Sequence, residues 1–419
     1  MKIGFIIALV FVAATAACGS DPADDVNGPT GRIVAVPADQ PSIQAAVDDA
    51  NPGDLVLISP GTYAEQVTIT TPRITVRGID RNTVVLDGGD RLGNGFAVSA
   101  DGVTIENLTV RAYTFNGIIF NGVGTDPDAT YGTGNDVLDG YRVNAVTAYN
   151  NGLYGIYAFS ARNGEIANSL TSGHPDSGIY VGQCQPCNVV IHGVISERNA
   201  IGYYGTNASG GVYVVNSTFR HNRLGITPNS QKMELLAPQV QTVIAGNLVV
   251  DNDDPDTPEV PRGFFGGGIV VGGGTEDIVL RNRVEGHPAY GIGLVSLNPF
   301  EPENNRVEGN VLADNNIDLL YGPGAEVTDP AGNCFVDNTF ISSAPEAIEA
   351  ALPCEGEPAV EYPLASVTLP TAPPGVDYRT MSAPDPQPSM PDAATAPAVA
   401  VPAQPVFPDL DTITVPPAQ

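Results

Sequence analysis

The sequence has few cations and few charged residues of any kind, and this excludes several classes of protein. Lysine occurs only as Lys2 and Lys232, and the formal net charge is −29 although charged residues make up just 16% of the chain. No basic stripe is present, and so acidic a surface repels phosphate backbones and anionic lipid headgroups. We therefore expect no nucleic-acid binding, and an acidic polymer would need a local arginine or calcium site.

Several catalytic signatures are also missing. The sequence contains no HExxH, no GxSxG, no P-loop and no dinucleotide fingerprint at a strand–helix junction. The GGG runs at 266–268 and 272–274 lie among β-forming residues and need no phosphate. No enzyme class that depends on these motifs is predicted.

Long apolar runs are absent except near the first residue. A charged start is followed by an apolar run over residues 3–14 and by the segment TAAC at 15–18. This order is typical of a secretory signal, and the run is short for a membrane span. It resembles the lipobox of bacterial lipoproteins, although Thr15 stands where leucine is usual. The resemblance implies a signal peptide over 1–17, lipidation of Cys18 and an exported protein on the outer face of the cell membrane or in the envelope. The alternative is an ordinary secretory signal.

Cysteine is scarce, and four residues are left for pairing after Cys18. An oxidising compartment would pair Cys184 with Cys187 and Cys334 with Cys354, as two local bridges. The CxxC could instead be redox-active or half of a zinc site. No βαβ pattern and no second CxxC accompany it, so we favour structural disulfides.

Composition divides the chain into segments. Residues 18–31 are short, polar and acidic and read as a tether, and residues 32–356 form the main domain. Residues 357–419 are rich in proline and alanine with little periodicity. Such a tail has too little apolar surface to offset its ordering entropy, and we predict that it is disordered.

A repeat of about 23 residues runs through the main domain. Glycines followed by isoleucine or tyrosine recur at 155, 178, 202 and 225 and again at 268 and 291, with insertions between 117 and 155 and between 225 and 268. An asparagine column precedes them, with substitutes at two positions: Asn151, His174, Asn199, Asn222, Asn252, Pro288 and Asn315. This period, with β-branched strands such as 212–215 and 269–271, predicts a solenoid of parallel strands with about ten coils.

The open end of such a solenoid needs a cover. Residues 41–50 have a serine cap and helical apolar spacing, and a strand follows at 55–58. The segment that Cys334 and Cys354 would staple is the candidate for the other end.

The stretch SIQAAVDDANPGDLVLISPGTYAEQVTI at 42–69 resembles the N-terminal cap and first coil of pectin-lyase-like right-handed parallel β-helix proteins. VVNSTFRHNRLGI at 214–226 and VLRNRVEGHPAYGI at 279–292 resemble later repeats of that superfamily. The resemblance covers about 32–345 and implies an all-β right-handed parallel β-helix. It does not select an activity, because the superfamily includes lyases, hydrolases, epimerases, esterases, tailspikes and proteins without established catalysis. The aspartate and arginine patterns of its pectate lyases, polygalacturonases and mannuronan epimerases are not reproduced, and His174-Pro175-Asp176 is a scrambled DPHD.

Polar residues from adjacent coils suggest a first candidate site. His174, Asp176, Arg198, His221 and Asp251 would lie close together, because coils are separated by about 5 Å. A neutral base, an acid and an arginine are what acid–base chemistry on a uronate needs. The alternative is that they are solvated turn residues.

A second candidate site follows the glycine column. Two residues after the glycines stand Tyr157, Tyr180 and Tyr204, which alternation turns outward. With Arg223 nearby, this strip could bind sugar rings. The alternative is that an insertion, 121–139 or 253–265, covers it as a minor core.

The third candidate is a metal-binding site. Asp251, Asp253, Asp254, Asp256 and Glu259 suit calcium, but their spacing departs from an EF-hand, and a solvated loop is the alternative. We assign no metal ligand, and calcium is the one cofactor considered.

Two functions follow. The first is a monomeric, lipid-anchored envelope protein that binds, and in a further step cleaves or epimerises, a polysaccharide or cell-wall glycan. The second is a non-catalytic surface scaffold, adhesin or envelope assembly factor.

Overall fold

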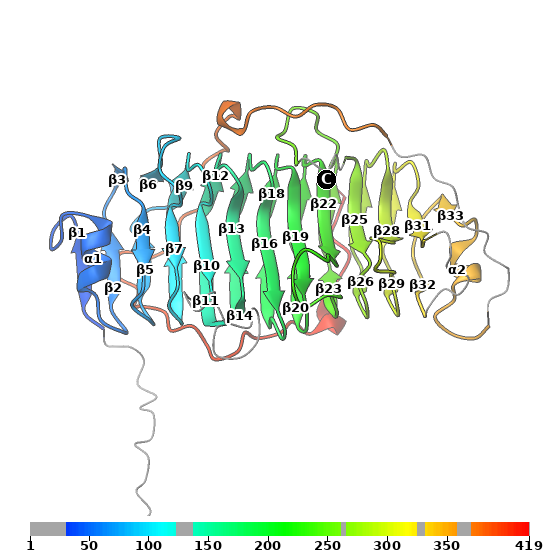
Figure 1. Cartoon of the computed structure of the whole chain (residues 1–419), viewed down its shortest axis with the longest axis horizontal. Helices are drawn as coiled ribbons and strands as arrows, with labels where there is room; N and C mark the ends of the chain where they lie inside the picture. Colours follow the sequence, from blue (N-terminus) through cyan, green and yellow to red (C-terminus); the bar gives the residue numbers. More distant parts are fainter. Residues whose placement is uncertain (1–30, 123–136, 261–264, 325–331, 358–369, 419) are drawn as a thin grey trace, which may run out of the picture.

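The computed structural model describes residues 31–122, 137–260, 265–324, 332–357 and 370–418. Over this part the chain winds into a rod of stacked coils (Figure 1). The strands form three sheets of 12, 11 and 10 strands, and neighbouring strands within each sheet are parallel. This confirms the predicted parallel β-helix and its stack of about ten coils.

Sheet A has 12 strands, each paired with the strand one coil away. They are β1 (Ile33–Val36), β2 (Leu55–Ile58), β5 (Thr75–Gly78), β8 (Val103–Glu106), β11 (Leu138–Asn144), β14 (Ala161–Ala167), β17 (Val189–His192), β20 (Val212–Val215), β23 (Thr242–Ala245), β26 (Ile278–Leu280), β29 (Arg306–Glu308) and β32 (Cys334–Val336).

Sheet B has ten short strands. They are β3 (Gly61–Tyr63), β6 (Val84–Asp87), β9 (Thr109–Arg111), β12 (Thr147–Tyr149), β15 (Leu170–Ser172), β18 (Ile195–Glu197), β21 (Thr218–Arg220), β24 (Leu248–Val250), β27 (Arg283–Glu285) and β30 (Val311–Ala313).

Sheet C has 11 strands and faces the viewer in Figure 1. They are β4 (Val67–Ile69), β7 (Phe96–Val98), β10 (Ile118–Asn121), β13 (Tyr154–Phe159), β16 (Ser177–Cys184), β19 (Ile201–Ala208), β22 (Leu224–Asn229), β25 (Gly267–Gly272), β28 (Tyr290–Val295), β31 (Leu319–Gly322) and β33 (Ser343–Ala344).

The residue after each repeat glycine faces the core, as the alternation predicts. In sheet C these residues stack in register from coil to coil, and all are fully buried: Ile118, Ile156, Ile179, Tyr203, Ile226, Ile269 and Ile292. Leu319, which follows Asp318, continues the column. Burying a large apolar side chain contributes about 1.5–3 kcal/mol, so such columns are the main stabilising feature of the rod.

A ladder of buried side chains runs along the turn between sheets B and C. Asn199 donates from Nδ2 to Oδ1 of Asn222 (3.1 Å), and Asn222 donates in the same way to Asn252 (2.8 Å). Asn315 ends this predicted column. At the coil where we predicted Pro288, the structure places His287, which accepts from Asn252 (3.1 Å). The prediction is wrong by one residue because two residues separate ladder and glycine in some coils, as between Asn199 and Gly202, and three in others, as between His287 and Gly291.

The repeat glycines are explained by this ladder. A Cβ on Gly202 would lie 2.5 Å from the carbonyl oxygen of Gly225 and 3.0 Å from Nδ2 of Asn222. No other residue leaves room for both the next coil and the ladder, so the glycine column is a packing requirement.

The N-terminal end is closed by a helix, as predicted. α1 spans Ile43–Asp49, and the side chain of Ser42 caps it by accepting from the backbone N–H of Ala45. Its buried residues Ile43, Ala46 and Val47 join the core. The helix therefore covers the first coil and shields it from edge-to-edge pairing.

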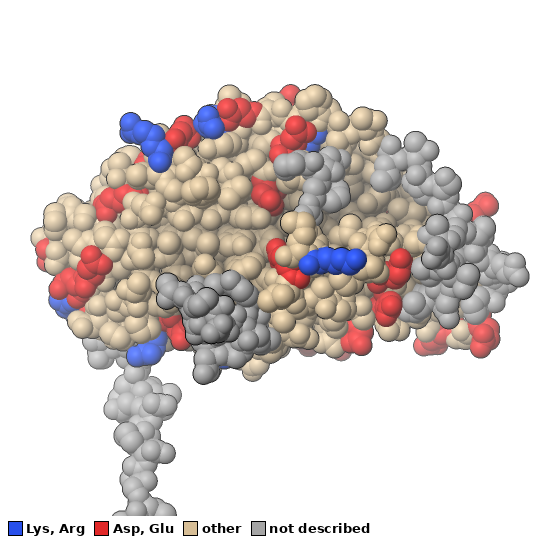
Figure 2. All heavy atoms as spheres, viewed as in Figure 1, with Lys and Arg blue, Asp and Glu red and all other residues tan. Residues whose placement is uncertain are grey.

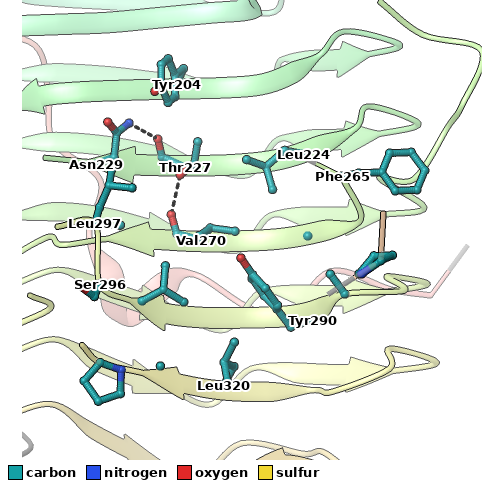
Figure 3. A pocket seen from close by; sticks show the side chains of 17 residues that line it. Tyr204, Leu224, Thr227, Asn229, Phe265, Val270, Tyr290, Ser296, Leu297 and Leu320 are labelled. Carbon is teal, nitrogen blue, oxygen red and sulfur yellow. Dashed lines mark hydrogen bonds between the residues drawn. The ribbon is translucent and has the colours of Figure 1, made fainter. Parts of the chain in front are cut away.

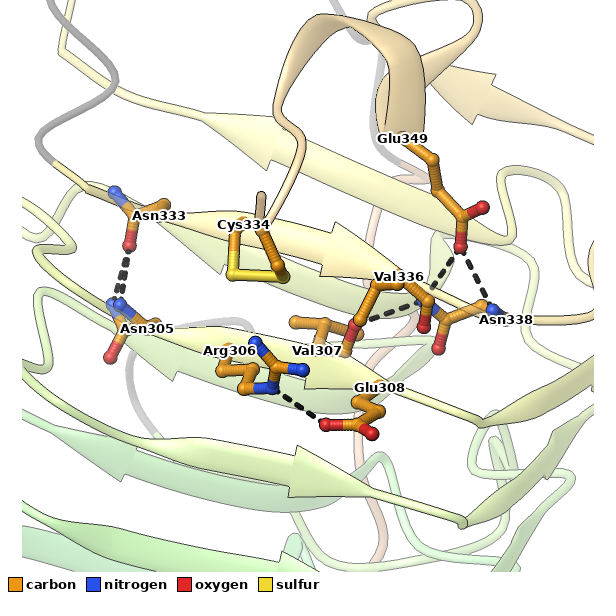
Figure 4. Close-up of a disulfide and its surroundings, with 10 residues drawn as sticks. Asn305, Arg306, Val307, Glu308, Asn333, Cys334, Val336, Asn338 and Glu349 are labelled. Atoms are coloured by element: carbon orange, nitrogen blue, oxygen red, sulfur yellow. Dashed lines mark hydrogen bonds and ion pairs between the residues drawn. A yellow bond between two sulfur atoms is a disulfide. The ribbon is translucent and has the colours of Figure 1, made fainter. Parts of the chain in front are cut away.

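The C-terminal end is closed by the stapled segment (Figure 4). Cys334 and Cys354 form a disulfide, and α2 (Ile348–Ala351) buries Ile348 and Ala351 against the last coils. Glu349 accepts from the backbone N–H and Nδ2 of Asn338 (2.8 and 3.0 Å), which satisfies the last amide of a second ladder. The second predicted disulfide, Cys184–Cys187, is also confirmed.

The disorder of the proline- and alanine-rich tail stays a prediction. The described part of the tail, residues 370–418, runs along the rod and includes η2 (Tyr378–Thr380) and η3 (Leu410–Thr412); it appears in orange and red in Figure 1. Arg77 is fully buried beneath it and donates to the carbonyl oxygens of Ala396 (2.6 Å) and Pro397 (2.8 Å). An extended proline-rich chain has no internal hydrogen bonds, so its carbonyls are free to accept from arginines of the rod.

The predicted signal peptide, Cys18 and the tether before residue 31 lie outside the described residues. Among the residues that the structure describes, no helix has the length and apolarity required to cross a membrane.

Candidate functional site

Sheet C presents a broad face on which charged side chains are sparse (Figure 2). None of its 11 strands contains Asp, Glu, Lys, Arg or His. Tyr157, Tyr180 and Tyr204 are in register with one another, and they belong to an apolar cluster that is separate from the core of the rod. The predicted outward positions therefore point away from the core. The second candidate site therefore lies on this face.

Three aromatic rings of β13 form what we call the aromatic patch: Tyr154, Tyr157 and Phe159. The ring centroids of Tyr154 and Tyr157 are 4.6 Å apart, and those of Tyr157 and Phe159 are 5.7 Å apart, with nearly parallel planes in both pairs. All three side chains are half-buried. Their stacking restricts their rotamers, so they offer a preformed apolar surface at little entropic cost.

The other two tyrosines of the predicted strip are covered by residues 231–236, which we call the covering loop. Tyr180 donates to Oε1 and Oε2 of Glu234 (2.8 and 3.0 Å), and Tyr204 binds the side-chain amide of Gln231. Asn207 anchors the loop by donating to the carbonyls of Gln231 and Leu235. The exposed fractions of Tyr180 and Tyr204 are therefore only 2% and 8%.

The strip is thus divided, and part of it is a minor core, as the alternative held. The tyrosine hydroxyls are covered by 231–236, which lies in the predicted insertion between 225 and 268 but outside the stretch 253–265. Of the insertion at 121–139, residues 123–136 lie outside the described residues. From 253–265, Val260 packs in the apolar cluster that contains Tyr180 and Tyr204, and Phe265 lines the neighbouring groove.

A groove of about 420 Å³ lies beyond the covering loop, over β19 to β31 (Figure 3). Tyr204, Leu224 and Leu320 line it with other apolar side chains, and Gly267 and Gly272 leave its floor open. The polar groups in its lining include Thr227, Asn229, Tyr290 and Ser296. Burial raises the pKa of Tyr290 to about 12, so this phenol stays neutral near pH 7.

Two carboxylates border the aromatic patch. Asp176 forms a hydrogen bond with Tyr154, and Glu234 accepts from Tyr180. Burial, reinforced by these carboxylates, raises the pKa of Tyr154, Tyr157 and Tyr180 well above the usual phenol value. The phenols therefore keep their protons. Asp176 is the one predicted catalytic residue that the structure brings to this face.

His174 belongs to the asparagine ladder and has no exposed surface. Its Nδ1 lies 2.7 Å from Oδ1 of Asn199, and its Nε2 lies 3.2 Å from Nδ2 of Asn151. These partners require the neutral tautomer with the proton on Nδ1. Burial lowers the pKa of His174 to about 4. The structure thus separates His174 from the other predicted catalytic residues, because it replaces an inward-facing asparagine.

The remaining predicted residues form a column on the turn just before the ladder. Arg198, His221 and Asp251 have φ values of 54°, 53° and 49° and lie on successive coils. No hydrogen bond or ion pair joins them to one another within the described chain. They are left-handed turn residues, and Arg198 borders a surface cleft whose other side is the tail segment 376–382. A single catalytic cluster of all five residues is not formed.

Arg223, predicted to bind substrate, is buried beneath the tail. Its Nη2 donates to the carbonyl oxygen of Pro373, and its guanidinium lies 5.1 Å from the ring centroid of Phe265. The exposed fraction of its side chain is 1%, and burial lowers its pKa. Arg223 therefore ties the tail to the insertion and has no surface to offer a ligand.

Two carboxylates of the acidic loop have contacts within the protein. Asp254 accepts from the backbone N–H of Asp256 (2.9 Å), and Glu259 lies 3.9 Å from Arg223. Burial and the carboxylates of Asp251 and Asp254 raise the pKa of Asp253. In the described part of the chain, no three His, Cys, Asp or Glu residues gather as metal ligands.

Sequence reasoning missed Tyr154, Phe159, Glu234 and the groove. Tyr154 and Phe159 flank a residue that was singled out, and they could have been found by reading β13 as a whole. Glu234 could not, because it lies in an insertion whose path only the tertiary structure determines.

The comparisons with known proteins concern the architecture. A family model for the right handed beta helix region matches residues 128–302. The chain folds as a right-handed parallel β-helix. No curated protein matches its sequence.

Solved structures with the same fold are distant in sequence. The mannuronan C-5 epimerase A-module of Azotobacter vinelandii is 14% identical with a TM-score of 0.47, over 72% of this chain and 91% of that chain. A pectate lyase is 17% identical with a TM-score of 0.46, over 72% and 74%. DFA-IIIase from Arthrobacter chlorophenolicus is 12% identical with a TM-score of 0.45, over 75% and 98%. Likenesses at this level concern the fold alone.

Proposed function

We propose that this protein is an exported, lipid-anchored β-helix that binds a polysaccharide on the outer face of sheet C. The aromatic patch and the uncharged groove, which lie on either side of the covering loop, carry the proposal. Sugar rings have apolar faces that stack on aromatic rings, and hydroxyls that bind neutral donors and acceptors. The face provides both within one continuous sheet.

Export is supported by the two disulfides. Such bridges persist in oxidising compartments and are rare in the cytosol. Lipidation of Cys18 is part of the proposal and rests on the lipobox resemblance. Mass spectrometry of the purified protein would test it, because a diacylated or triacylated N-terminal cysteine changes the mass of the first peptide, whereas a Cys18→Ser variant would lack the modification.

The decisive experiment for glycan binding is a glycan array with the purified protein, with and without calcium, followed by calorimetry on the best ligand. Tyr157→Ala should raise Kd about five- to tenfold, because one aromatic contact is worth about 1 kcal/mol. Tyr149→Ala on sheet B is the matched control, since Tyr149 is also a half-buried strand tyrosine. Equal effects of both variants would contradict the proposal.

Processing of the bound glycan stays a prediction. Asp176 and Glu234 are the two carboxylates beside the aromatic patch, and acid–base chemistry on a sugar placed there would use them. The measurement is release of reducing or unsaturated ends by the protein, compared with the Asp176→Asn and Glu234→Gln variants. Binding without release would leave a lectin-like rod.

One observation favours the alternative of a scaffold or adhesin. Met233 and Leu235 of the covering loop are 84% and 53% exposed, and exposed apolar side chains at a site often mark a protein contact. Crosslinking in the envelope would identify such a partner. A partner that is lost in a Met233→Ser variant, with no glycan bound by the protein, would establish this function.

A further inference from the structure

Ionisable residues are distributed unequally among the three sheets. Sheet A carries a chain of contacts in which Arg77 pairs with Glu106, Glu106 with Arg142, and Arg142 with Glu165, at 2.6–2.7 Å, and Glu165 reaches His192 at 3.0 Å. Sheet B carries pairs such as Arg111 with Asp87 and Arg220 with Glu197. The 11 strands of sheet C carry no ionisable group except tyrosine and cysteine. Absence of charge is therefore a property of this face and not of the whole rod.

The side chains that line the groove are also uncharged. Its polar side chains, Thr227, Asn229, Tyr290 and Ser296, are neutral hydrogen-bonding groups. Neutral groups discriminate poorly between anions and cations but pair well with hydroxyls, which both donate and accept. A ligand with a carboxylate or sulfate on each sugar would leave those groups desolvated without a partner in the groove.

The charged groups around the face are mainly anionic. Asp176 and Glu234 lie beside the aromatic patch, and Glu301 accepts from Ser296 at the edge of the groove (2.9 Å). Lys232 on the covering loop is an exposed cation, and it is two residues from Glu234. Arg223 is held beneath Pro373. The local field, like the net charge of −29, opposes an anionic polymer.

We infer that the ligand of sheet C is an uncharged glycan, built of neutral hexoses or N-acetylhexosamines, and not a uronan or a sulfated polymer. The inference rests on the proposed function and narrows it. It also predicts that binding depends little on salt, because no ion pair forms with the ligand.

The test compares oligosaccharides of equal length by calorimetry: cellohexaose, mannohexaose and chitohexaose against hexagalacturonate, hexamannuronate and a heparin hexasaccharide. We expect at least one neutral hexasaccharide to bind at least tenfold more tightly than every anionic one, with or without calcium. Its Kd should change less than twofold between about 0.05 and 0.5 M NaCl, because charge screening has nothing to weaken.

Adding a cation to the groove should have the opposite effect and favour an anionic ligand. Val295→Lys places a cation in the lining of the groove, on the half-buried end of β28. It should strengthen hexagalacturonate binding at least fivefold and make it salt-dependent. Val311→Lys on β30 of sheet B is the matched control, because Val311 is also a half-buried strand valine, and it should leave binding unchanged.

The possible results test the inference and the proposed function separately. Tighter binding of an anionic hexasaccharide by the unmodified protein would overturn the inference while the proposed glycan-binding function holds. Binding of no glycan at all, by a protein whose circular dichroism shows the β-helix intact, would overturn the proposed function and the inference with it. A neutral ligand whose affinity falls steeply with salt would also contradict the inference.

Discussion

The two ladder histidines should make the β-helix sensitive to mild acid. His174 and His287 are fully buried, and each occupies an asparagine position with Nδ1 donating to the next asparagine. Neither ring can accept a second proton without losing its bond from the preceding amide. Lowering the pH therefore acts on the centre of the rod and not on its surface.

The size of this loss of stability follows from the shifted pKa values of the two histidines. Burial lowers the pKa of both histidines from 6.5 to about 4. Between these two values the unfolded chain binds more protons than the folded one, so stability is fully present above pH 6.5 and is lost as the pH falls towards 4. With about 1.4 kcal/mol per pKa unit, going from pH 7 to pH 5 costs about 2 kcal/mol for each histidine and about 4 kcal/mol for both.

The assay is urea unfolding at pH 7, 6 and 5 for the unmodified protein and for the His174→Asn/His287→Asn double variant. Asparagine occupies the other rungs of the ladder and does not titrate, so the unmodified protein should lose about 4 kcal/mol relative to the variant between pH 7 and pH 5. Asp277, whose pKa is raised to about 7, adds about 2 kcal/mol of stability over the same range in both proteins and cancels in the comparison. Glu165 does not interfere, because its pKa is lowered to about 2 by His192 and Arg142 and its contribution is lost only below its unfolded value near 4.5. An unfolding midpoint that changes by the same amount with pH in both proteins would refute the reasoning.

Three further predictions concern stability. Asp277→Asn should stabilise the protein by about 4 kcal/mol above pH 7 and by little at pH 4. Burial raises the pKa of Asp277 from 3.8 to about 7, so the unmodified protein loses stability as the pH rises from 3.8 to 7. Urea unfolding midpoints measured against pH would show the difference between the two proteins. Removal of residues 370–418 should lower the unfolding free energy by about 3 kcal/mol or more, since it exposes Arg77 and an apolar part of sheet A; an unchanged melting temperature would contradict this. Cys334→Ser should destabilise the C-terminal end by about 3 kcal/mol, because the bridge to Cys354 closes a loop of 20 residues, and faster hydrogen exchange confined to α2 and β32 would report it.

Much of the fold could be predicted because a solenoid repeats its local physics. The glycine period identified the coils, since a Cβ at those positions collides with the next coil. Ser42 and the helical spacing after it located α1, and the pairing of four cysteines followed from their proximity in sequence. Each of these signals lies within one coil or one short segment.

The site was less predictable because it depends on contacts between distant segments. His174 looked like a catalytic base because the repeat places it on a coil next to that of Arg198, yet an imidazole can replace the asparagine amide in a ladder. Arg223 looked available until the tail, about 150 residues later, supplied the carbonyl of Pro373. Composition alone also gave no sign that the tail would find arginines such as Arg77 to bind.

The arrangement of the tail bears on which face is functional. Along sheet A it covers an apolar cluster that includes Val190, Val215 and Leu280, to which its own Ile413 contributes, and it bonds to Arg281. On sheet C its described part reaches only the edge of the groove, through Pro370. A rod that needed only stability would gain from covering its aromatic face in the same way. The half-buried stacked rings on that face and the absence of charge from its strands are therefore the features on which the proposed ligand site of sheet C rests.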